Sequence, residues 1–420
     1  MLKQRADKVL CSVLSRFHEL DVKSGRGCYL YDHDGVAFLD FGSGIAVTST
    51  GHCHPDVVRA VQEQVSTLIH PCIAVGNTEV VVDCAEKLVS LMQSDDYSVF
   101  FEQSGAGAVE AALKLAKFVT KRHQVLAFEG GFHGRSMGAL SVTTSKKAYR
   151  DNIGPMLDGV SFFPYPNTYR SSHESITDIS VTAYIEQLKQ SGAIHSDLAA
   201  VIIEPILGEG GYVAAPIEFL QCVADLCKQH NVLLIVDEVQ SGIGRTGSWF
   251  QFQKAGISPD IVVMAKGLGS GMPIAACVGK TEIMNQWSKG SHGGTYGANP
   301  VTCAAASATI DIISKQLSAI SDLSDYANDL LEPLRSHPYI GDIRIEGLMI
   351  GIECVKDHST KEPYSTMVAD ILQKCLDNQL IVLSCGVYSN VIRLAPPLIV
   401  TKEELTTGLK TLMEIINDYD

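Results

Sequence analysis

Two residues in this sequence have the types and positions that covalent cofactor chemistry needs. Asp237 follows the apolar run LLIV, and Lys266 ends the run IVVMAK and precedes the flexible GLGSG. A carboxylate at the end of a buried strand is costly unless it meets a cation or several donors. A lysine in apolar surroundings can lose its charge and become a nucleophilic amine. If both residues face one crevice, they suit an aldehyde cofactor whose ring nitrogen needs a counter-ion; the alternative is a structural ion pair between them.

Two glycine-rich segments could complete such a site. The segment QSGAGAVEAALKLAK begins at Gln103, and its small residues open a helix whose apolar positions recur at helical spacing. Free backbone N–H groups at such a start bind phosphate, although Ser-Gly before a helix is often only a cap. The segment GGFHGR places Phe132 just after the predicted strand QVLAF, where its ring could stack on a flat cofactor. Taken alone, Phe132 is more often a core residue and Arg135 more often part of a surface ion pair.

The chain from roughly residue 55 to 320 alternates helical stretches with short apolar strands. The predicted strands are SVFF, QVLAFE, AAVIIEP, LLIVDEV and DIVVMAK. Continuous apolar strands separated by helices predict an α/β fold, with a mostly parallel sheet covered on both faces. Several of the polar residues lie at the carboxyl ends of these strands, where ligands bind in open α/β sheets.

Both ends of the chain depart from this alternation. Residues 1–17 predict an amphipathic helix, and residues 26–47 alternate around Asp34-Gly35, which indicates a hairpin. After about residue 310 come long helices and strands at LMIGIECV, LIVLSCG and VIRLAPP. Because 420 residues exceed what one core usually serves, we expect two domains. The large one covers 55–310, and an α+β small one combines the N-terminal helix and hairpin segment, 1–54, with 311–420.

The composition argues against several classes of function. Hydrophobic residues make up 46% of the chain and charged residues 19%, which is typical of a globular protein. The formal net charge of −14 repels a phosphate backbone, so we expect no nucleic-acid partner. No apolar run reaches the length of a membrane span, and the N-terminus lacks the apolar core and cleavage site of a signal peptide.

The cysteines indicate the redox environment of the protein, and together with the histidines they bear on whether it binds a metal. The twelve cysteines form no CxxC pair, which indicates reduced, mostly buried thiols and a cytoplasmic location. The stretch GHCHP offers His52, Cys53 and His54 as metal ligands, but the sequence has no partner cluster elsewhere. We therefore expect no metal.

Together these pieces resemble one family across nearly the whole chain. The sequence is similar to the class III (ω-amino acid) aminotransferases of fold type I, which use pyridoxal 5′-phosphate. The matching motifs, in order, are DFGSGIAV, GHCHP, SGAGAVEAALKLAK, FHGR, IIEPILGEGG, DEVQSGIGRTG, AKGLGSGMPIAA, HGGTYGANP and VIRLAPPL. The combination of DEVQSGIGRTG and AKGLGSGMP is highly specific. Within the family the resemblance is strongest to bacterial 4-aminobutyrate aminotransferases, mainly through GIAV and GGTYGANP.

The resemblance implies a cofactor site. Lys266 would bind the cofactor covalently and Asp237 would pair with its protonated ring nitrogen. The ring would lie between Val239 and Phe132, with Gln240 near its hydroxyl group and with His133 tuning or supporting it. The backbone N–H groups of Gly105 and Ala106 would hold the phosphate. Thr295 of a neighbouring subunit would add its hydroxyl group, which implies a homodimer with shared active sites and leaves a tetramer open.

The resemblance also implies how substrates bind. Arg135 and Arg393 would be two carboxylate clamps, Glu209 a mobile counter-ion for Arg393, Glu204 part of the pocket wall, and Ile45 an apolar wall. The implied reaction moves the amino group of 4-aminobutyrate to 2-oxoglutarate. The alternatives are acetylornithine, ornithine or diamine aminotransferases of the same family, and an aminomutase or racemase that keeps the same lysine and aspartate.

Three residues depart from the family pattern. Gln103 stands where Asn or Thr is common, Gly107 where Glu is common, and Leu207 where Gln is common. Gly107 lies beside the predicted phosphate-binding turn and removes a side chain that would brace it. Leu207 removes a polar group between Glu204 and Glu209. Both departures affect cofactor affinity and substrate choice rather than the lysine and aspartate.

Overall fold

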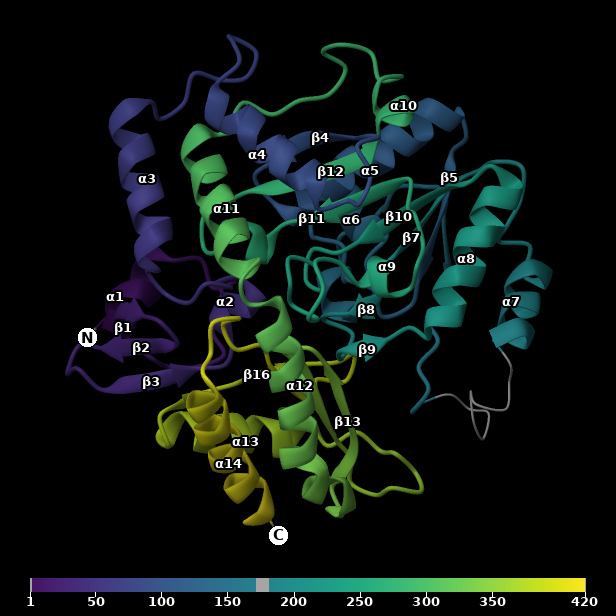
Figure 1. Ribbon diagram of the computed structural model, residues 1–420. Helices are drawn as coiled ribbons and strands as arrows, with labels where there is room; N and C mark the ends of the chain where they lie inside the picture. The colour runs from purple at the N-terminus through teal and green to yellow at the C-terminus, as the bar shows by residue number, and fades with distance from the viewer. Residues whose placement is uncertain (1, 171–180, 420) are drawn as a thin grey trace.

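A seven-stranded sheet forms the centre of the computed structural model, which describes residues 2–170 and 181–419 (Figure 1). Its strand order is β4-β12-β11-β10-β7-β5-β6, and only β12 runs against its neighbours. The strands are β4 (Tyr97–Glu102), β5 (Gln124–Phe128), β6 (Val160–Phe163), β7 (Leu198–Ile203), β10 (Leu233–Asp237), β11 (Ile261–Met264) and β12 (Ala275–Lys280). All five strands expected from the sequence are present, and the mostly parallel sheet is confirmed.

Apolar strands of this kind require cover on both faces. Every residue of β7 and β11 is buried, as expected for strands packed on two sides. Helix α5 (Gly105–Thr120) packs on one face, against β10, β11 and β12. Helices α4 (Glu79–Ser90), α8 (Ile217–His230) and α11 (Pro300–Ile313) belong to the core on the other face. The sheet is therefore held rigidly between two apolar cores.

The C-terminal part has its own sheet and core. Strands β13 (Ile340–Glu346), β14 (Met349–Cys354), β17 (Val391–Leu394) and β16 (Leu383–Cys385) pair in that order, all antiparallel. Helices α12 (Leu317–Leu331), α13 (Ser365–Asp377) and α14 (Lys402–Asn417) pack with this sheet around a separate apolar cluster.

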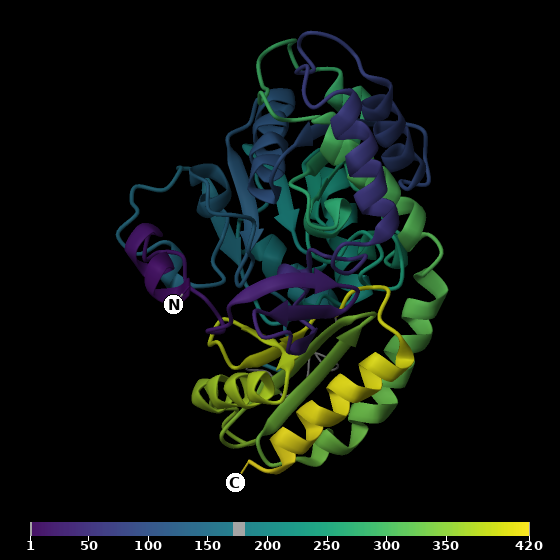
Figure 2. The same ribbon diagram turned by 90° about the vertical axis from the view of Figure 1, so that its left-hand side faces the viewer.

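The N-terminal strands join this C-terminal part rather than the central sheet (Figure 2). Strands β1 (Val22–Arg26), β2 (Tyr29–Asp32) and β3 (Ala37–Asp40) form a meander, and the predicted hairpin around Asp34-Gly35 is confirmed as β2–β3. Strand β15 (Leu380–Ile381) pairs in parallel with β3. This pairing supports the proposal that residues 1–54 belong to the small domain.

The remaining elements are short or peripheral. They are α1 (Leu2–Val9), α2 (Ser43–Ala46), α3 (Pro55–Thr67), α6 (Met137–Ser141), η1 (Lys147–Tyr149), α7 (Val181–Gln190), β8 (Ile206–Leu207), β9 (Val213–Ala214), α9 (Gln251–Lys254), η2 (Lys266–Gly269), α10 (Thr281–Met284) and η3 (Glu332–Ser336). The predicted N-terminal helix ends at Val9 instead of reaching residue 17, and none of its residues is buried. Within residues 2–170 and 181–419, no helix combines the length and apolarity that a membrane crossing needs.

Candidate active site

A cavity of about 440 Å³ lies where the parallel strands end. Strands β4, β5, β7, β10 and β11 run in the same direction, so the residues that follow them converge at one edge of the sheet. Ten of the fourteen site residues expected from the sequence line this cavity: Gly105, Ala106, Phe132, His133, Arg135, Glu204, Asp237, Val239, Gln240 and Lys266. The other four are Ile45, Glu209, Thr295 and Arg393.

Asp237 is held in place by two hydrogen bonds. Its Oδ2 lies 2.7 Å from Nδ1 of His133, and its Oδ1 accepts the N–H of Val239 at 3.0 Å. Burial alone would lower the pKa of His133, but the hydrogen bond and negative charge of Asp237 outweigh burial, and the net shift is upward. Within the part of the chain that the structure describes, no ion pair joins Asp237 to Lys266. Asp237 is therefore oriented by His133 and does not depend on the lysine.

Lys266 begins η2 directly after β11, with a left-handed backbone (φ +39°). Such a conformation in a non-glycine residue is strained by roughly 1 kcal/mol or more, and it persists because the two apolar cores fix the strand before it. Burial lowers the pKa of Lys266, and the positive charge of Arg393 lowers it further. Nearby carboxylates raise the pKa, but the net shift is downward. The amine is therefore easier to deprotonate than an exposed lysine, as a nucleophile or base requires.

The start of α5 forms a turn with little room for side chains. Ser104 caps the helix, its Oγ accepting the N–H of Gly107 at 3.1 Å. A Cβ at Gly105 would lie 3.1 Å from Cγ1 of Val239, so glycine lets the turn approach β10 closely. The N–H groups of Gly105 and Ala106 belong to the first turn, which has no partner within the helix, and the cavity lies beside them. The Ser104 cap therefore does not exclude an anion site at the same turn.

The cavity wall is braced by buried polar groups. Glu204 accepts the N–H of Phe132 at 2.7 Å and the N–H of Gly208 at 2.9 Å. Burial raises the pKa of Glu204 to about 7. Gln240 accepts the hydroxyl of Tyr212 at 3.0 Å. These bonds fix Phe132 and the loop after β7 even when no ligand is bound.

Arg393 and Glu209 form a buried ion pair beside the cavity. Arg393 lies on β17, and its Nη1 donates to Oε1 of Glu209. Burial would raise the pKa of Glu209, but the charges of Arg393 and Lys266 and the hydrogen bond from Arg393 together outweigh burial, and the pKa is lowered. Among the described residues, Nε and Nη2 of Arg393 have no hydrogen-bond partner. Both charges act on the pKa of Lys266, which places the pair near that amine.

Arg135 is exposed at the cavity mouth and pairs with an aromatic ring rather than a carboxylate. Its guanidinium carbon lies 5.5 Å from the ring centroid of Tyr149, and that ring also packs edge-on against Phe132, with centroids 5.7 Å apart. Burial raises the pKa of Tyr149, Glu209 raises it further, and Arg135 and Arg393 oppose the rise. The phenol therefore lies within reach of both arginines.

Sequence reasoning missed Tyr149. It stands at the end of the short helix η1 in a polar stretch, SKKAYR, with no apolar period or strand beside it. Lys146, just before that helix, acts on the pKa of Glu209 and was missed as well. No local pattern marks either residue, because their closeness to Arg135 and Glu209 arises only in the folded chain.

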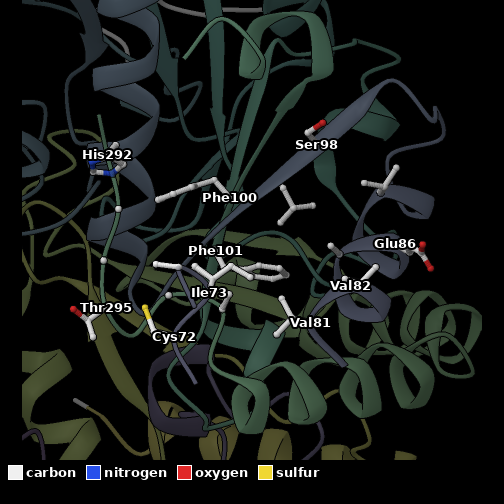
Figure 3. A pocket seen from close by; sticks show the side chains of 18 of the residues that line it. Cys72, Ile73, Val81, Val82, Glu86, Ser98, Phe100, Phe101, His292 and Thr295 are labelled. Carbon is white, nitrogen blue, oxygen red and sulfur yellow. The ribbon is translucent and has the colours of Figure 1, made fainter. Parts of the chain in front are cut away.

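Ile45 and Thr295 lie outside the lining of this cavity. Ile45 is 37% exposed in α2, also with a left-handed backbone (φ +69°). Thr295 is exposed and lines a second, largely apolar cavity of about 870 Å³ between α4, β4 and the loop 292–298 (Figure 3). Within one subunit, Thr295 therefore faces a different cavity from Lys266.

The histidines of GHCHP have structural partners. Nε2 of His52 lies 2.8 Å from Oδ2 of Asp40, and Nδ1 of His54 accepts the N–H of Asp56 at the start of α3. The same Asp40 holds the turn at Gly42 and Ser43 through its other oxygen. The motif therefore positions the segment from β3 to α2.

Comparison with known proteins identifies the family. The model of the family "Aminotransferase class-III" matches residues 12–416. A Bacillus subtilis protein named "Probable 4-aminobutyrate aminotransferase" is 36% identical over 98% of this chain and 96% of its own length. A Pyrococcus horikoshii "Alanine/serine racemase" is also 36% identical, over 99% of this chain and 90% of its own. A Pseudomonas putida protein named 5-aminovalerate aminotransferase is 36% identical over 98% of this chain and 97% of its own length. A Bacillus subtilis acetylornithine aminotransferase is 37% identical over 95% of this chain and 95% of its own length.

The solved structures agree with these sequence relatives. The structure of a thermostable (S)-enantioselective ω-transaminase from Thermomicrobium roseum superposes with a TM-score of 0.94 at 27% identity, covering 100% of this chain and 98% of that one. The expected fold type I is thus confirmed, and the names of the relatives leave the substrate unsettled. The chain belongs to the class III aminotransferases, a family of enzymes that depend on pyridoxal 5′-phosphate.

Proposed function

We propose that this enzyme transfers the amino group of an ω-amino acid, 4-aminobutyrate first, to 2-oxoglutarate, giving succinic semialdehyde and L-glutamate. The observation that carries this proposal is the Glu209–Arg393 pair, in which Nε and Nη2 of the arginine have no partner among the described residues. An arginine binds a carboxylate through two parallel hydrogen bonds. When the substrate has one carboxylate, held by Arg135, Glu209 neutralises Arg393. When 2-oxoglutarate brings a second, Glu209 moves away and Arg393 binds it.

The residues that line the cavity fit the donor set that pyridoxal phosphate needs. Bound there, the cofactor would supply a ring that withdraws electrons from the substrate carbon bearing the amine. Asp237 would hold a positive charge at the ring nitrogen, Val239 and Phe132 would contact the ring, and the N–H groups of Gly105 and Ala106 would bind the phosphate. Membership of the family supports these roles, and all five residues line the cavity.

Several further residues position the ring or the substrate. His133 orients Asp237, Glu204 fixes Phe132, and Gln240 would approach the ring hydroxyl. Nζ of Lys266 takes the proton from the amine-bearing carbon and returns one later, acting as both general base and general acid. Its lowered pKa supports the first of these two roles.

We further propose that the active unit is a homodimer. The cavity of about 870 Å³ that contains Thr295 is apolar, with Ile73, Val81 and Phe101 on its walls (Figure 3). A second copy seated there would cover this surface and bring Thr295 to the partner's phosphate site. Analytical ultracentrifugation should give a dimer or tetramer, and Thr295→Ala should weaken cofactor binding; a monomer with unchanged affinity would contradict the proposal.

A panel of amino donors tests the reaction. With 2-oxoglutarate as acceptor, we expect glutamate formation to be fastest with 4-aminobutyrate, and slower with 5-aminovalerate, N-acetylornithine and ornithine. Lys266→Ala, the control, should give no turnover. Faster turnover with N-acetylornithine or ornithine would assign the enzyme to the alternative aminotransferases.

The racemase-named relative keeps an isomerase as the second candidate function. An isomerase would need no oxo-acid acceptor, so the two reactions separate cleanly. Each enantiomer of alanine and serine is incubated without 2-oxoglutarate and analysed by chiral chromatography. Interconversion at a rate comparable to transamination would favour the isomerase, and its absence would leave the aminotransferase.

A further inference from the structure

Glu102, the last residue of β4, buries its carboxyl group against the start of α5. Only 6% of the residue is exposed. A Cβ at Gly107 would lie 3.2 Å from its Cδ and 2.9 Å from its Oε2, and at the second distance the carboxyl end of Glu102 would have to move. The carboxyl group therefore fills the space that a side chain at position 107 would need.

The same carboxyl group also lies beside the loop that carries Thr295. A Cβ at Gly294 would lie 3.6 Å from Oε2 of Glu102, and Nε2 of His292 is 3.7 Å from Oε1. His292 is fixed in turn, since its Nδ1 lies 2.8 Å from Nζ of Lys114 on α5 and its ring stacks on Trp287 at 5.0 Å. Figure 3 shows His292 and Thr295 on this loop, on one side of the apolar cavity.

The carboxyl group interacts electrostatically with the helix that it packs against. Burial raises the pKa of Glu102, opposed by the backbone N–H of Gln103 and by the charge of Lys114 on α5.

We propose that Glu102 is a positioning residue that packs the phosphate turn 104–107 against the loop 291–297, taking the space left by Gly107. In this chain the acidic group comes from the end of β4, whereas the family pattern has an acidic residue on the helix, at position 107. Glu102 thereby sets the direction of the N–H groups of Gly105 and Ala106 and of the loop bearing Thr295. This inference rests on the phosphate-binding role proposed above.

The test is a double-mutant cycle on the full chain. Four variants are compared with the wild type: Glu102→Ala, Glu102→Gln, Gly107→Ala and the double variant Glu102→Ala/Gly107→Ala. Each protein is stripped of cofactor and titrated with pyridoxal phosphate, and binding is followed by absorbance. The thermal midpoint of each cofactor-free protein is also measured. Glu102→Ala should weaken binding about tenfold, and the isosteric Glu102→Gln by less than about threefold. Gly107→Ala should weaken binding in the wild-type background, where the carboxyl is in the way, and much less in the Glu102→Ala background, where the space is empty.

Glu414→Ala, an exposed glutamate on α14, is the control and should match the wild type. If Glu102→Ala lowers only the cofactor-free midpoint and leaves affinity unchanged, the residue is merely structural and the proposal fails. Equal penalties for Gly107→Ala in both backgrounds would also overturn it. A failed substrate assignment would leave all these affinities as expected, so the two proposals are tested separately.

Discussion

At the scale of single residues, the site depends on buried charges that neighbours hold in place. Asp237 is fixed by His133 and by the N–H of Val239, so the aspartate is oriented whether or not a ring nitrogen faces it. Arg393 and Glu209 neutralise each other while two guanidinium nitrogens lack partners in the described structure. Removing such charged groups from water costs free energy, and buried charges of this kind are concentrated at functional sites.

The His133–Asp237 pair should appear in the pH dependence of stability. Because the pKa of His133 is raised in the fold, the pair's contribution is complete below the ordinary histidine pKa, about 6.5, and is lost as pH rises through the folded pKa. Asn at position 133 can keep a donor but has no charge. The thermal midpoint advantage of the cofactor-free wild type over His133→Asn should therefore shrink between about pH 6 and pH 9. A constant difference across that range would contradict the raised pKa.

Tyr149 should affect substrate binding more than turnover. Its ring packs on both Arg135 and Phe132, so Tyr149→Ala loses two contacts together worth about 1–2.5 kcal/mol. We expect its KM for the amino donor to rise roughly tenfold with a smaller change in kcat, and Tyr149→Phe, which keeps the ring, to stay near the wild type. Steady-state kinetics decide this, and an unchanged KM in the alanine variant would remove Tyr149 from the site.

At the scale of elements, the start of one helix is capped and also borders the cavity. Ser104 caps α5, and the same turn presents the N–H groups of Gly105 and Ala106 to the cavity. Thr401 caps α14 in the same way, in a capping box with Glu404, in the C-terminal part of the chain. The two caps therefore separate a loss of helix stability from a loss of cofactor binding.

Ser104→Ala and Thr401→Ala should each lower the free energy of unfolding by about 1 kcal/mol, because each leaves one N–H at a helix start without its acceptor. Only Ser104→Ala should also weaken pyridoxal phosphate binding, since its cap orders the phosphate turn. Denaturant unfolding and cofactor titration measure the two quantities. Equal cofactor affinity in both variants would show that the turn is ordered without its cap.

At the scale of the whole molecule, the site joins the central sheet to the C-terminal one. Asp237 ends β10 and Lys266 follows β11 in the first sheet, whereas Arg393 belongs to β17 of the second. The loop between β8 and β9 connects them. The carbonyl of Glu209 accepts the N–H of Gly386, and the carbonyl of Gly211 accepts Nε of Arg344. The proposed role of Arg393 in substrate binding therefore depends on how the two parts of the chain are held together.

Glu209→Gln tests that arrangement through the two half-reactions. Without its counter-ion, Arg393 stays charged and unpaired when a substrate with a single carboxylate binds. We expect KM for 4-aminobutyrate to rise about tenfold and KM for 2-oxoglutarate to change little, because its second carboxylate replaces Glu209. Equal changes for both substrates in steady-state kinetics would argue against a mobile counter-ion.

Much of this architecture could be predicted from short stretches of the sequence. Strands such as LAAVII and IVVM are buried on both faces, and their composition alone indicates it. Strands β6, β12 and β13 were not predicted, and the run LIVLSCG, expected as one strand, divides into β15 and β16 in two different sheets. Periodicity shows that a segment is extended and apolar, but its pairing partners depend on chain segments far away.

The sequence by itself determined the strand-end positions of Asp237 and Lys266 and the glycine-rich turn before α5, because burial pattern and turn chemistry are local properties. Only the tertiary structure decided that His133 rather than Lys266 pairs with Asp237, that Tyr149 lies against Arg135, and that Glu102 fills the space beside Gly107. Those contacts join residues from different elements, and their distances follow from how the sheets and helices pack.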